Sequence, residues 1–370
     1  MKKILFIHSS LGGGGAERVL IDILKNIDTD SFQVDLLLIY GTGVYMKDIP
    51  ANINYIGCLY EKKRPFWKWF VARLHLGHLF ECREIRRVMK GRYYDTIVSF
   101  MENGPLKYHG FITDKAQNNV SWVHTDLLNN HYSRCSFLSD NHEKKIYQKM
   151  NTIVFVSDTA LNNFQKLFNL RNVNMKVIHN PIDAVRIQTR SLEESVPKIK
   201  FTLCAVGRIC PQKRYDRLLH AVKILYDKGC DITVNILGTG YMEAEIKKMC
   251  SSLNLDTIVN FLGFKENPYP YIKNSDVFCL SSDTEGYPTV VCEAIVLGVP
   301  VIATDIVGSR DIIGQNEYGL LTGLTPESFA DAIYSLYNDE SLLNYYKRKA
   351  SEKAKEFGIS RAIKEINTVI

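Results

Sequence analysis

Short apolar runs alternate with longer stretches of helical periodicity along most of the chain. The runs are rich in Val, Ile, Leu and Phe, which is typical of strands buried on both faces of a parallel sheet. In the first half, the predicted strands are residues 2–8, 32–39, 54–56, 95–100, 119–123, 152–156 and 176–179. In the second half, they are residues 201–206, 231–237, 258–262, 277–280, 299–303 and 319–321. Strands that alternate with helices predict an α/β fold, because helical crossovers join parallel strands.

The alternation occurs twice, on either side of a stretch that lacks apolar periodicity. Residues 188–198 (QTRSLEESVPK) carry this interruption and predict a linker. We therefore expect two Rossmann-like, doubly wound parallel-sheet domains, at 1–185 and 186–357, that face each other across a cleft. Ligands of open α/β sheets bind at the carboxyl ends of strands, so polar residues that follow strands are the candidate site residues.

Two carboxylates stand eight positions apart in the segment 281–294, SSDTEGYPTVVCEA. Glu285 falls in a predicted strand-to-helix loop, and Glu293 falls about one turn into a helix whose first amides belong to Thr289 and Val290. Two acceptors for sugar hydroxyls beside an anion-binding helix start indicate a nucleotide-sugar site. The alternative is an ordinary loop glutamate and a glutamate favoured by the helix dipole. Spacing alone leaves both open.

Three other groups of polar residues also follow strands. Arg208 and Lys213 follow the strand 201–206, where they either bind a diphosphate or form a solvated basic loop. The loop 9–18 contains four consecutive glycines, which let a backbone approach a ligand or simply make a flexible turn. His124 ends a strand, and it either contacts a sugar hydroxyl, acts as an acid or base, or is structural.

Composition narrows the function classes. The chain has 370 residues, 46% hydrophobic residues and no apolar run of about 18, so we expect full cores and no spanning helix. The N-terminal apolar stretch, residues 4–7, is too short for a signal peptide. The nine cysteines are scattered and include no CxxC pair, so we expect neither disulfide bonds nor a zinc site. A reducing, cytoplasmic location is therefore expected. A net charge of +6 is weak evidence for nucleic acid, which we do not expect as a partner.

Two local patterns bear on metals and membranes. Asp28 and Asp30 form a DxD, but they precede a strand and so predict a capped turn instead of a metal site. The segment 62–73 combines five basic residues with Phe and Trp. It either attaches the protein peripherally to the anionic inner face of the plasma membrane or packs its aromatics into a core. Both alternatives stay open.

Taken together, these motifs resemble the retaining family 4 glycosyltransferases of the two-Rossmann (GT-B) type, the class of bacterial polysaccharide and glycolipid biosynthesis. The resemblance spans the chain and is strongest in the second half. The motifs that carry it are GGAER at 14–18, NPID at 180–183, Gly207-Arg208 with Lys213, Gly263-Phe264, EGYPTVVCEA and GVPVIATD at 298–305.

The resemblance implies a role for each candidate of the second half. Arg208 and Lys213 would bind the donor diphosphate and stabilise its charge as it leaves. Glu285 would contact the donor sugar, and Glu293 the ribose hydroxyls. The amides of Thr289 and Val290 would face phosphate. Gly207 and Gly286 would belong to the donor site, and Phe264 would meet the base.

For the first half, the resemblance implies an acceptor-side domain. Gly14 and Gly15 would let this domain close on the diphosphate, and His124 matches the family's active-site histidine. The tail 358–370 resembles a helix that crosses back to the first domain. Two departures are Pro288, where many members have glycine, and the absence of the family's frequent tryptophan from the tail.

The expected function is therefore retaining, metal-independent transfer of a hexose-type sugar. The donor would be a nucleoside-diphosphate sugar, with UDP commoner than GDP in the family, and the acceptor a glycan or polyprenyl-linked glycan of cell-surface polysaccharide assembly. No cofactor is expected beyond this co-substrate. The alternatives are a nucleotide-sugar 2-epimerase of similar fold and a catalytically silent nucleotide-sugar-binding subunit.

Overall fold

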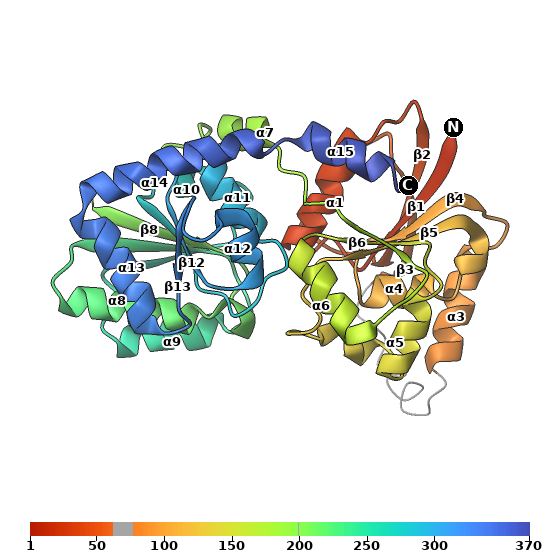
Figure 1. The fold of residues 1–370 in the computed structure, drawn as a ribbon, viewed down its shortest axis with the longest axis horizontal. Coiled ribbons are helices and arrows are strands. Elements are labelled where there is room, and N and C mark those ends of the chain that lie inside the picture. Colours follow the sequence, from red (N-terminus) through yellow and green to blue (C-terminus); the bar gives the residue numbers. More distant parts are fainter. Residues whose placement is uncertain (62–76, 199) are drawn as a thin grey trace. The chain divides into compact units, whose positions relative to one another are not determined.

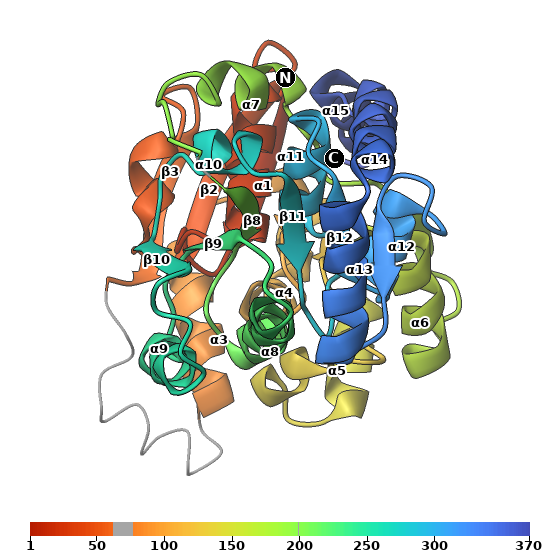
Figure 2. The same cartoon turned by 90° about the vertical axis from the view of Figure 1, so that its left-hand side faces the viewer.

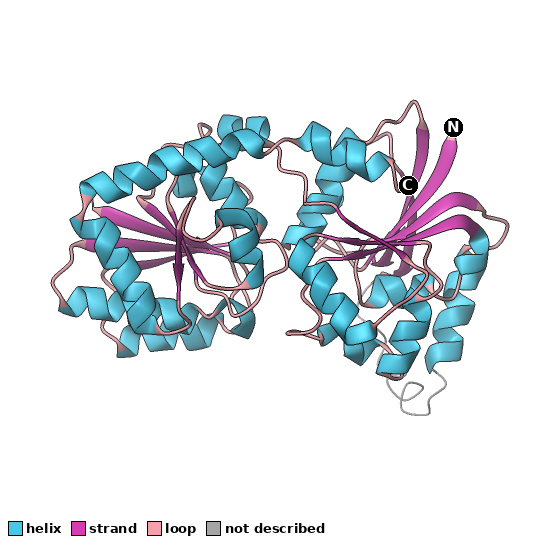
Figure 3. Ribbon diagram, viewed as in Figure 1, coloured by secondary structure: helices cyan, strands magenta, loops and turns pink. Residues whose placement is uncertain are grey.

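The computed structural model describes residues 1–61, 77–198 and 200–370, and it divides into two compact units. Unit 1 comprises Met1–Pro181 and Ser360–Ile370, and unit 2 comprises Ile182–Ile359. In each unit a parallel sheet lies between layers of helices (Figure 3). The predicted α/β class with two parallel-sheet domains is therefore confirmed.

The sheet of unit 1 has seven parallel strands in the order β3-β2-β1-β4-β5-β6-β7. The strands are β1 (Lys2–His8), β2 (Phe32–Tyr40), β3 (Asn54–Tyr60), β4 (Tyr94–Ser99), β5 (Ala116–Val123), β6 (Thr152–Phe155) and β7 (Asn174–Val177). The chain order reverses between β1 and β4. In open α/β sheets the carboxyl ends of the strands at such a switch point are where ligands bind.

Helices cover both faces of this sheet (Figure 1). They are α1 (Gly15–Asn26), α3 (Gly77–Val88), α4 (Gly104–His109), α5 (Asp140–Tyr147), α6 (Asp158–Phe168) and α15 (Ile359–Asn367), with 3-10 turns η1 (Val44–Asp48), η2 (Thr113–Lys115) and η3 (Tyr132–Ser136). Helices α3 to α6 lie on one face, where α4, α5 and α6 share an apolar core with β5 and β6. Helices α1 and α15 lie on the other face.

The C-terminal segment packs onto unit 1. Ile363 and Ile366 of α15 are buried, as are Val369 and Ile370. The side-chain amide of Asn118 in β5 donates to the carbonyl oxygen of Val369 at 2.9 Å, so the last residues are bonded to this strand. Burial of the apolar side of a short helix, more than helix propensity, holds such a segment in place.

The sheet of unit 2 has six parallel strands in the order β10-β9-β8-β11-β12-β13. They are β8 (Phe201–Val206), β9 (Ile232–Leu237), β10 (Val259–Gly263), β11 (Val277–Leu280), β12 (Val301–Thr304) and β13 (Leu320–Thr322). Alternation within β8 shows why its sequence is apolar throughout. Leu203 and Ala205 belong to one core and Cys204 to the core on the opposite face, so the strand is buried on both sides.

Helices α8, α9 and α13 cover one face of this sheet, and α10, α11 and α14 cover the other (Figure 2). The helical elements of unit 2 are α7 (Ala184–Arg190), η4 (Pro211–Lys213), α8 (Tyr215–Asp227), α9 (Glu243–Ser252), α10 (Tyr269–Lys273), α11 (Thr289–Val296), α12 (Val307–Ile313), α13 (Pro326–Asn338), α14 (Glu340–Lys353) and η5 (Ala354–Glu356). None of the helices described is long and apolar enough to cross a bilayer.

The predicted linker at 188–198 is wrong at its start, because α7 continues to Arg190. Asp183 caps this helix, since its Oδ1 accepts from the amide of Arg186 at 3.0 Å, and Ile187 is buried. A seven-residue helix with one buried apolar residue has too little periodicity to be recognised in the sequence. The segment 62–73 lies outside the described residues.

Candidate functional site

The segment that carries Glu285 is the loop between Leu280, the last residue of β11, and the start of α11. Residues that follow or end the neighbouring strand β12 hold the backbone of this loop in place. The Thr304 hydroxyl donates to the carbonyl oxygen of Ser282. At Gly308 an added Cβ would lie 2.8 Å from the carbonyl oxygen of Glu285, so only glycine permits this close approach. The loop therefore has one well-defined path.

Lys213 and Glu285, both predicted site residues, form a direct ion pair. Lys213 Nζ donates to Glu285 Oε1 at 2.6 Å, and the Ser282 hydroxyl donates to the same oxygen at 2.7 Å. The two side chains are 18% and 13% exposed. They meet because β8 and β11 are adjacent parallel strands, whose following loops lie at the same edge of the sheet.

A buried arginine also holds the backbone of this loop. Arg217 of α8 is 2% exposed. Its guanidinium donates to the carbonyl oxygens of Ser281 and Leu324 at 2.5 and 2.8 Å, and it pairs with Asp283 at 2.6 Å. Two of these contacts, Ser281 and Asp283, lie just before Glu285, so the fork geometry of one arginine holds the backbone that carries this carboxylate.

Further bonds join the loop after β8 to the loop after β11. Gln212 donates to the carbonyl oxygen of Thr284 at 2.6 Å, and the amide of Asp283 donates back to the Gln212 carbonyl at 2.9 Å. Arg214 pairs with Asp283 at 2.9 Å. Sequence reasoning missed these supporting residues. A solvated basic loop was one of the two alternatives for the residues after β8, but the Arg217 side chain in this region is buried.

Gly207 and Arg208 follow β8 directly. A Cβ at Gly207 would lie 3.3 Å from Lys213 Cε, so glycine leaves room for the lysine stem. The buried Tyr215 hydroxyl donates to the Gly207 carbonyl oxygen at 3.1 Å. Arg208 is exposed, and no residue in the described ranges pairs with it. Its guanidinium is therefore available to an anion.

The start of α11 lies next to this pair. Pro288 fits the first position of a helix by sequence, where no N–H is needed, but in the structure it is the cap residue and Thr289 begins the helix. Within the described part of the chain, the amides of Thr289 and Val290 have no hydrogen-bond acceptor. Gly286 is buried, and Glu293, the fifth helical residue, is partly exposed. Free amides at a helix start favour an anion.

Phe264 stands apart from this group within unit 2. It follows β10, is 44% exposed, and lies three strands away from β11 in the sheet order. Three strand spacings are about 14 Å. The unit therefore brings Gly207, Lys213, Glu285 and the α11 start together, and it leaves Phe264 at the edge of the sheet.

In unit 1, the predicted glycine loop joins β1 to α1. Gly15 is the first residue of α1, and Gly14 precedes it as the cap residue. An added Cβ at Gly14 would collide with the Glu17 carboxylate. Gly13 has a φ of 100°, so it is the glycine that the backbone conformation requires.

His124 follows β5 at the carboxyl edge of the same sheet. Its ring lies 4.7 Å from the Phe100 ring, centroid to centroid. Burial, with a smaller contribution from the neighbouring His8, lowers the pKa of His124 to about 3. Its Nε2 is buried and has no hydrogen-bond partner among the described residues. The imidazole is therefore neutral at physiological pH.

Glu102, which sequence reasoning missed, positions the backbone at His124. Its carboxylate is fully buried and accepts from the His124 amide at 3.1 Å and from the Tyr132 hydroxyl at 2.9 Å. Burial raises the pKa of Glu102. In the sequence, its place just after a predicted strand was the signal that could have identified it.

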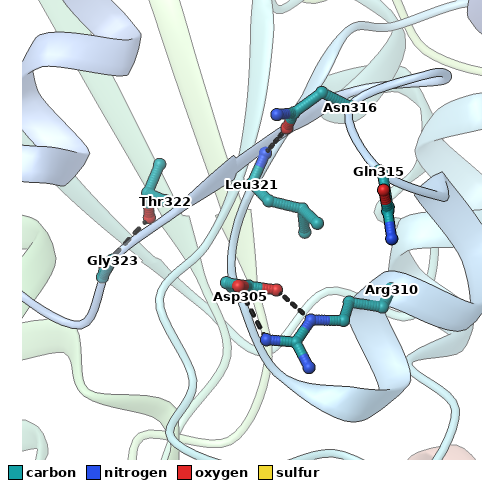
Figure 4. Close-up of a pocket in the computed structure, with 7 residues that line it drawn as sticks. All are labelled: Asp305, Arg310, Gln315, Asn316, Leu321, Thr322 and Gly323. Atoms are coloured by element: carbon teal, nitrogen blue, oxygen red, sulfur yellow. Dashed lines mark hydrogen bonds and ion pairs between the residues drawn. The ribbon is translucent and has the colours of Figure 1, made fainter.

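A pocket of about 420 Å³ lies at the carboxyl ends of β12 and β13 (Figure 4). Arg310 donates twice to the Asp305 carboxylate across it, and Asn316 accepts from the Leu321 amide at 2.6 Å. The lining residues are Asp305, Arg310, Gln315, Asn316, Leu321, Thr322 and Gly323. Its charges already neutralise each other, so we assign it no ligand.

The DxD motif has the predicted structure of a capped turn. Asp28 accepts from the Asp30 amide at 3.0 Å and from the Ser31 hydroxyl at 2.5 Å, just before β2. Over residues 1–61, 77–198 and 200–370, no group of three His, Cys, Asp or Glu side chains is arranged to hold a metal ion.

Comparison with known proteins covers nearly the whole chain. Residues 13–186 match the family described as Glycosyltransferase Family 4, and residues 188–354 match the family described as Glycosyl transferases group 1. Among solved structures, HepE of Anabaena in complex with UDP-glucose superposes with a TM-score of 0.77 at 20% identity, covering 100% of this chain and 99% of that one.

Two curated proteins of Campylobacter jejuni are similar over nearly their full length. One is N-acetylgalactosamine-N,N'-diacetylbacillosaminyl-diphospho-undecaprenol 4-alpha-N-acetylgalactosaminyltransferase, 28% identical and covering 96% of each chain. The other is GalNAc-alpha-(1->4)-GalNAc-alpha-(1->3)-diNAcBac-PP-undecaprenol alpha-1,4-N-acetyl-D-galactosaminyltransferase, 27% identical and covering 99% of this chain and 97% of the relative. With these matches and its two parallel-sheet units, the chain belongs to the GT-B glycosyltransferases, with a family 4 domain followed by a group 1 domain.

Proposed function

We propose that the protein transfers a sugar from a nucleoside-diphosphate sugar to a glycan or lipid-linked acceptor during cell-surface polysaccharide assembly, with retention of anomeric configuration. The observation that carries the proposal is the Lys213–Glu285 pair beside the unpaired Arg208 and the free α11 amides. These groups suit a nucleotide sugar. The cations Arg208 and Lys213 and the free amides at the start of α11 can bind phosphate, and the Glu285 carboxylate can accept from sugar hydroxyls.

In this proposal, Arg208 and Lys213 bind the diphosphate. The charge on the leaving phosphate grows as the bond to the sugar breaks, and fixed cations stabilise that transition state more than the ground state. Lys213 contacts phosphate without leaving Glu285, because an ammonium has three donors. The amides of Thr289 and Val290, together with Gly207 and Gly286, line the phosphate side.

The hydroxyl groups of the donor sugar and of the ribose are proposed to donate hydrogen bonds to carboxylates. Glu285 keeps one carboxylate oxygen for Lys213 and Ser282, and its other oxygen accepts from a donor-sugar hydroxyl. Glu293 accepts from the ribose hydroxyls, and Phe264 contacts the base from the edge of the sheet. UDP is the proposed nucleotide, because the HepE neighbour was solved with UDP-glucose.

Retention is proposed through a same-face displacement. The bond between the sugar and the diphosphate breaks, and the acceptor oxygen bonds to the sugar on the same face. The acceptor proton passes to an oxygen of the leaving diphosphate. Glu285 is not proposed as the nucleophile, because Lys213 and Ser282 hold its Oε1 and its other oxygen is assigned to a donor-sugar hydroxyl.

The acceptor side is assigned to unit 1, with Gly14, Gly15 and His124. His124 is proposed to serve transfer more than donor binding, because it lies in the other unit from Lys213. Both Campylobacter relatives carry undecaprenol in their names, so a polyprenyl-linked glycan is the proposed acceptor class.

We also propose peripheral attachment at the inner membrane face. Arg83, Arg87 and Lys90 are exposed along α3 and the turn after it, at helical spacing, with Leu79 68% exposed on the same helix. Anionic lipid attracts such residues by about 1 kcal/mol each.

The deciding experiment supplies purified protein with a UDP-sugar panel, with and without an undecaprenyl-diphosphate-linked glycan, and analyses products by mass spectrometry. Transfer predicts a glycan extended by one sugar, with the donor's anomeric configuration. A free epimerised sugar formed without acceptor would indicate a 2-epimerase, and the absence of turnover with intact UDP binding would indicate a silent subunit.

A further inference from the structure

The first half of the glycine loop, which joins β1 to α1, is hydrogen-bonded to the turn that follows β2. Strands β1 and β2 are parallel neighbours in the sheet. At the end of β2, the Tyr40 amide donates to the Ser9 carbonyl oxygen at 2.8 Å. Past both strands, the Leu11 amide donates to the Thr42 carbonyl oxygen at 3.0 Å, and the Tyr45 amide donates to the Leu11 carbonyl oxygen at 3.1 Å. These bonds fix the backbone of the glycine loop as far as Leu11.

Gly43 allows the two backbones to lie this close together. Its φ is 138°, in the range that favours glycine. An added Cβ would lie 2.0 Å from the carbonyl carbon and oxygen of Leu11, and 2.7 Å from the nitrogen of Gly12. These are backbone atoms, which cannot rotate away as the end of a long side chain can. Any larger residue at position 43 must therefore displace the glycine loop.

Side chains join the residues after the glycine loop to the same turn. Arg18 is the fourth residue of α1, and its guanidinium carbon lies 5.4 Å from the centroid of the Tyr45 ring. Arg18 Nη1 also lies 4.0 Å from Asp48 Oδ2. Both partners belong to η1, and all three side chains are partly buried. Partial burial strengthens a cation–π contact, because less water surrounds the cation.

The turn 42–48 therefore holds the glycine loop on both sides of its glycines. Leu11 is attached before them and Arg18 after them, which leaves residues 12–15 as a short span between the two attachments. Gly12 and Gly15 are exposed, and the two glycines between them are partly exposed. Glycines sample many backbone conformations, but fixing both ends of so short a span limits where their amides can lie.

We propose that the turn 42–48, through Gly43, Tyr45 and Asp48, positions the glycine loop for the donor diphosphate. The inference rests on the proposed glycosyltransfer and on the role that the family resemblance implies for Gly14 and Gly15, which is to let unit 1 close on that diphosphate. Ordering a glycine-rich span around a ligand costs conformational entropy, and attachment on both sides lowers this cost before the donor arrives. The three residues act through the backbone of the loop, so they are positioning residues.

Substitutions at Tyr45 separate positioning from folding. Tyr45→Leu removes the ring that faces Arg18 but keeps an apolar side chain, whereas Tyr45→Phe keeps the ring. Gly43→Ala is a stronger variant that displaces the loop directly. The matched control is Tyr93→Leu, because Tyr93 also lies under a cation of unit 1, 4.4 Å from Lys115 Nζ. Tyr93 precedes β4, so it lies at the opposite edge of the same sheet.

The measurements are kcat with saturating donor and acceptor, UDP affinity by calorimetry, and hydrogen exchange of the glycine-loop amides in the full chain. The donor is whichever UDP-sugar of the panel gives transfer. Tyr45→Leu should lower kcat about three- to tenfold and speed exchange in the glycine loop. UDP affinity should not change, because the proposed diphosphate ligands Arg208 and Lys213 lie on unit 2. Gly43→Ala should lower kcat further, while Tyr45→Phe and Tyr93→Leu should keep it.

Three results would overturn the proposal. The first is a wild-type kcat in Tyr45→Leu, and the second is an equal loss of kcat in the control Tyr93→Leu. The third is unchanged hydrogen exchange of the glycine loop in Tyr45→Leu, which needs no activity to measure and does not depend on whether Gly43→Ala folds. If the wild type transfers no sugar, the proposed function fails, and this exchange comparison still decides whether the turn holds the loop.

Discussion

Lys213 Nζ lies 2.6 Å from Glu285 Oε1, so the cation proposed for phosphate is held by the carboxylate proposed for the sugar. Each group orients the other before a donor arrives. Both are mostly buried, so water screens the pair less than it would a surface ion pair. A site organised in this way loses little side-chain entropy when the donor binds.

The first prediction concerns Lys213. Lys213→Ala should weaken UDP binding by about 1.5–3 kcal/mol, since a charge-assisted contact is lost and Glu285 is left without its partner. Isothermal calorimetry measures the affinity. The control is Lys223→Ala on α8, which removes a lysine of another ion pair and should leave binding unchanged. Wild-type affinity and turnover in Lys213→Ala would exclude the assigned role.

A second prediction concerns Arg217, a positioning residue. Arg217→Leu should cost about 2–4 kcal/mol of unfolding free energy, because two carbonyl oxygens lose their donor and Asp283 loses a cation. It should also lower kcat, since the Glu285 loop loses its support. Urea unfolding and saturating kinetics test both. The milder Asp283→Asn keeps an acceptor and should lower kcat with little loss of stability. A stable, fully active Arg217→Leu would refute the role.

Sequence reasoning found the strands and the charged loops because both leave local signals. A parallel strand buried on both faces is an apolar run, and residues just after such runs share one edge of the sheet. The pattern made Lys213 and Glu285 candidates, the family resemblance assigned both to the donor site, and in the structure the two side chains lie 2.6 Å apart. Their roles in donor binding stay a prediction.

The supporting residues had no local signal. Arg217 is a basic residue on an exposed-looking helix start, and only Ser281, Asp283 and Leu324, more than sixty positions away, explain its burial. His8 ends an apolar run and carries no motif, and its burial and its contact with the Ser10 carbonyl oxygen appear only in the structure. Such roles follow from tertiary contacts, which one sequence does not reveal.

A third prediction concerns acid. Burial lowers the pKa of His109 to about 4, below the usual value of about 6.5, so the unfolded chain binds this proton between those values and the native protein does not. Stability should therefore fall as pH falls from 7 to 5, by at most about 2 kcal/mol from this group. Buried Glu102 and Glu143 oppose the trend, since their pKa values are raised.

Comparison of variants isolates the histidine term. Urea unfolding measures the free energy of unfolding of the wild type and of His109→Gln at pH 7 and pH 5. The difference between the two proteins should be smaller at pH 5 than at pH 7. The exposed His220→Gln serves as control and should keep the wild-type pH dependence. An equal stability difference at both pH values would contradict the expectation.

The fourth prediction is that turnover needs no divalent metal. The motivation is that Arg208 and Lys213 supply two cations where a metal would otherwise neutralise the diphosphate. Activity measured in excess EDTA should match activity without it. A loss of activity that magnesium or manganese restores would show that the two side chains are insufficient.

The last prediction concerns the membrane. Arg83, Arg87 and Lys90 are exposed on or just after α3, and Leu79 adds an apolar group on the same helix. Anionic vesicles should therefore cosediment the protein, and less so at high salt, because screening shortens the range of attraction. Changing the three basic residues to Glu should cost about a hundredfold in vesicle affinity, because three residues contribute about 3 kcal/mol.

The matched control for this experiment carries the same charge change on unit 2, at the exposed Lys228, Lys247 and Lys248. It should sediment like the wild type. If both triple variants lose binding equally, net charge alone attracts the protein and α3 is no anchor. If both bind as the wild type does, attachment resides elsewhere, and the basic segment 62–73 is then tested by changing Lys62, Lys63, Arg64 and Lys68 to Glu.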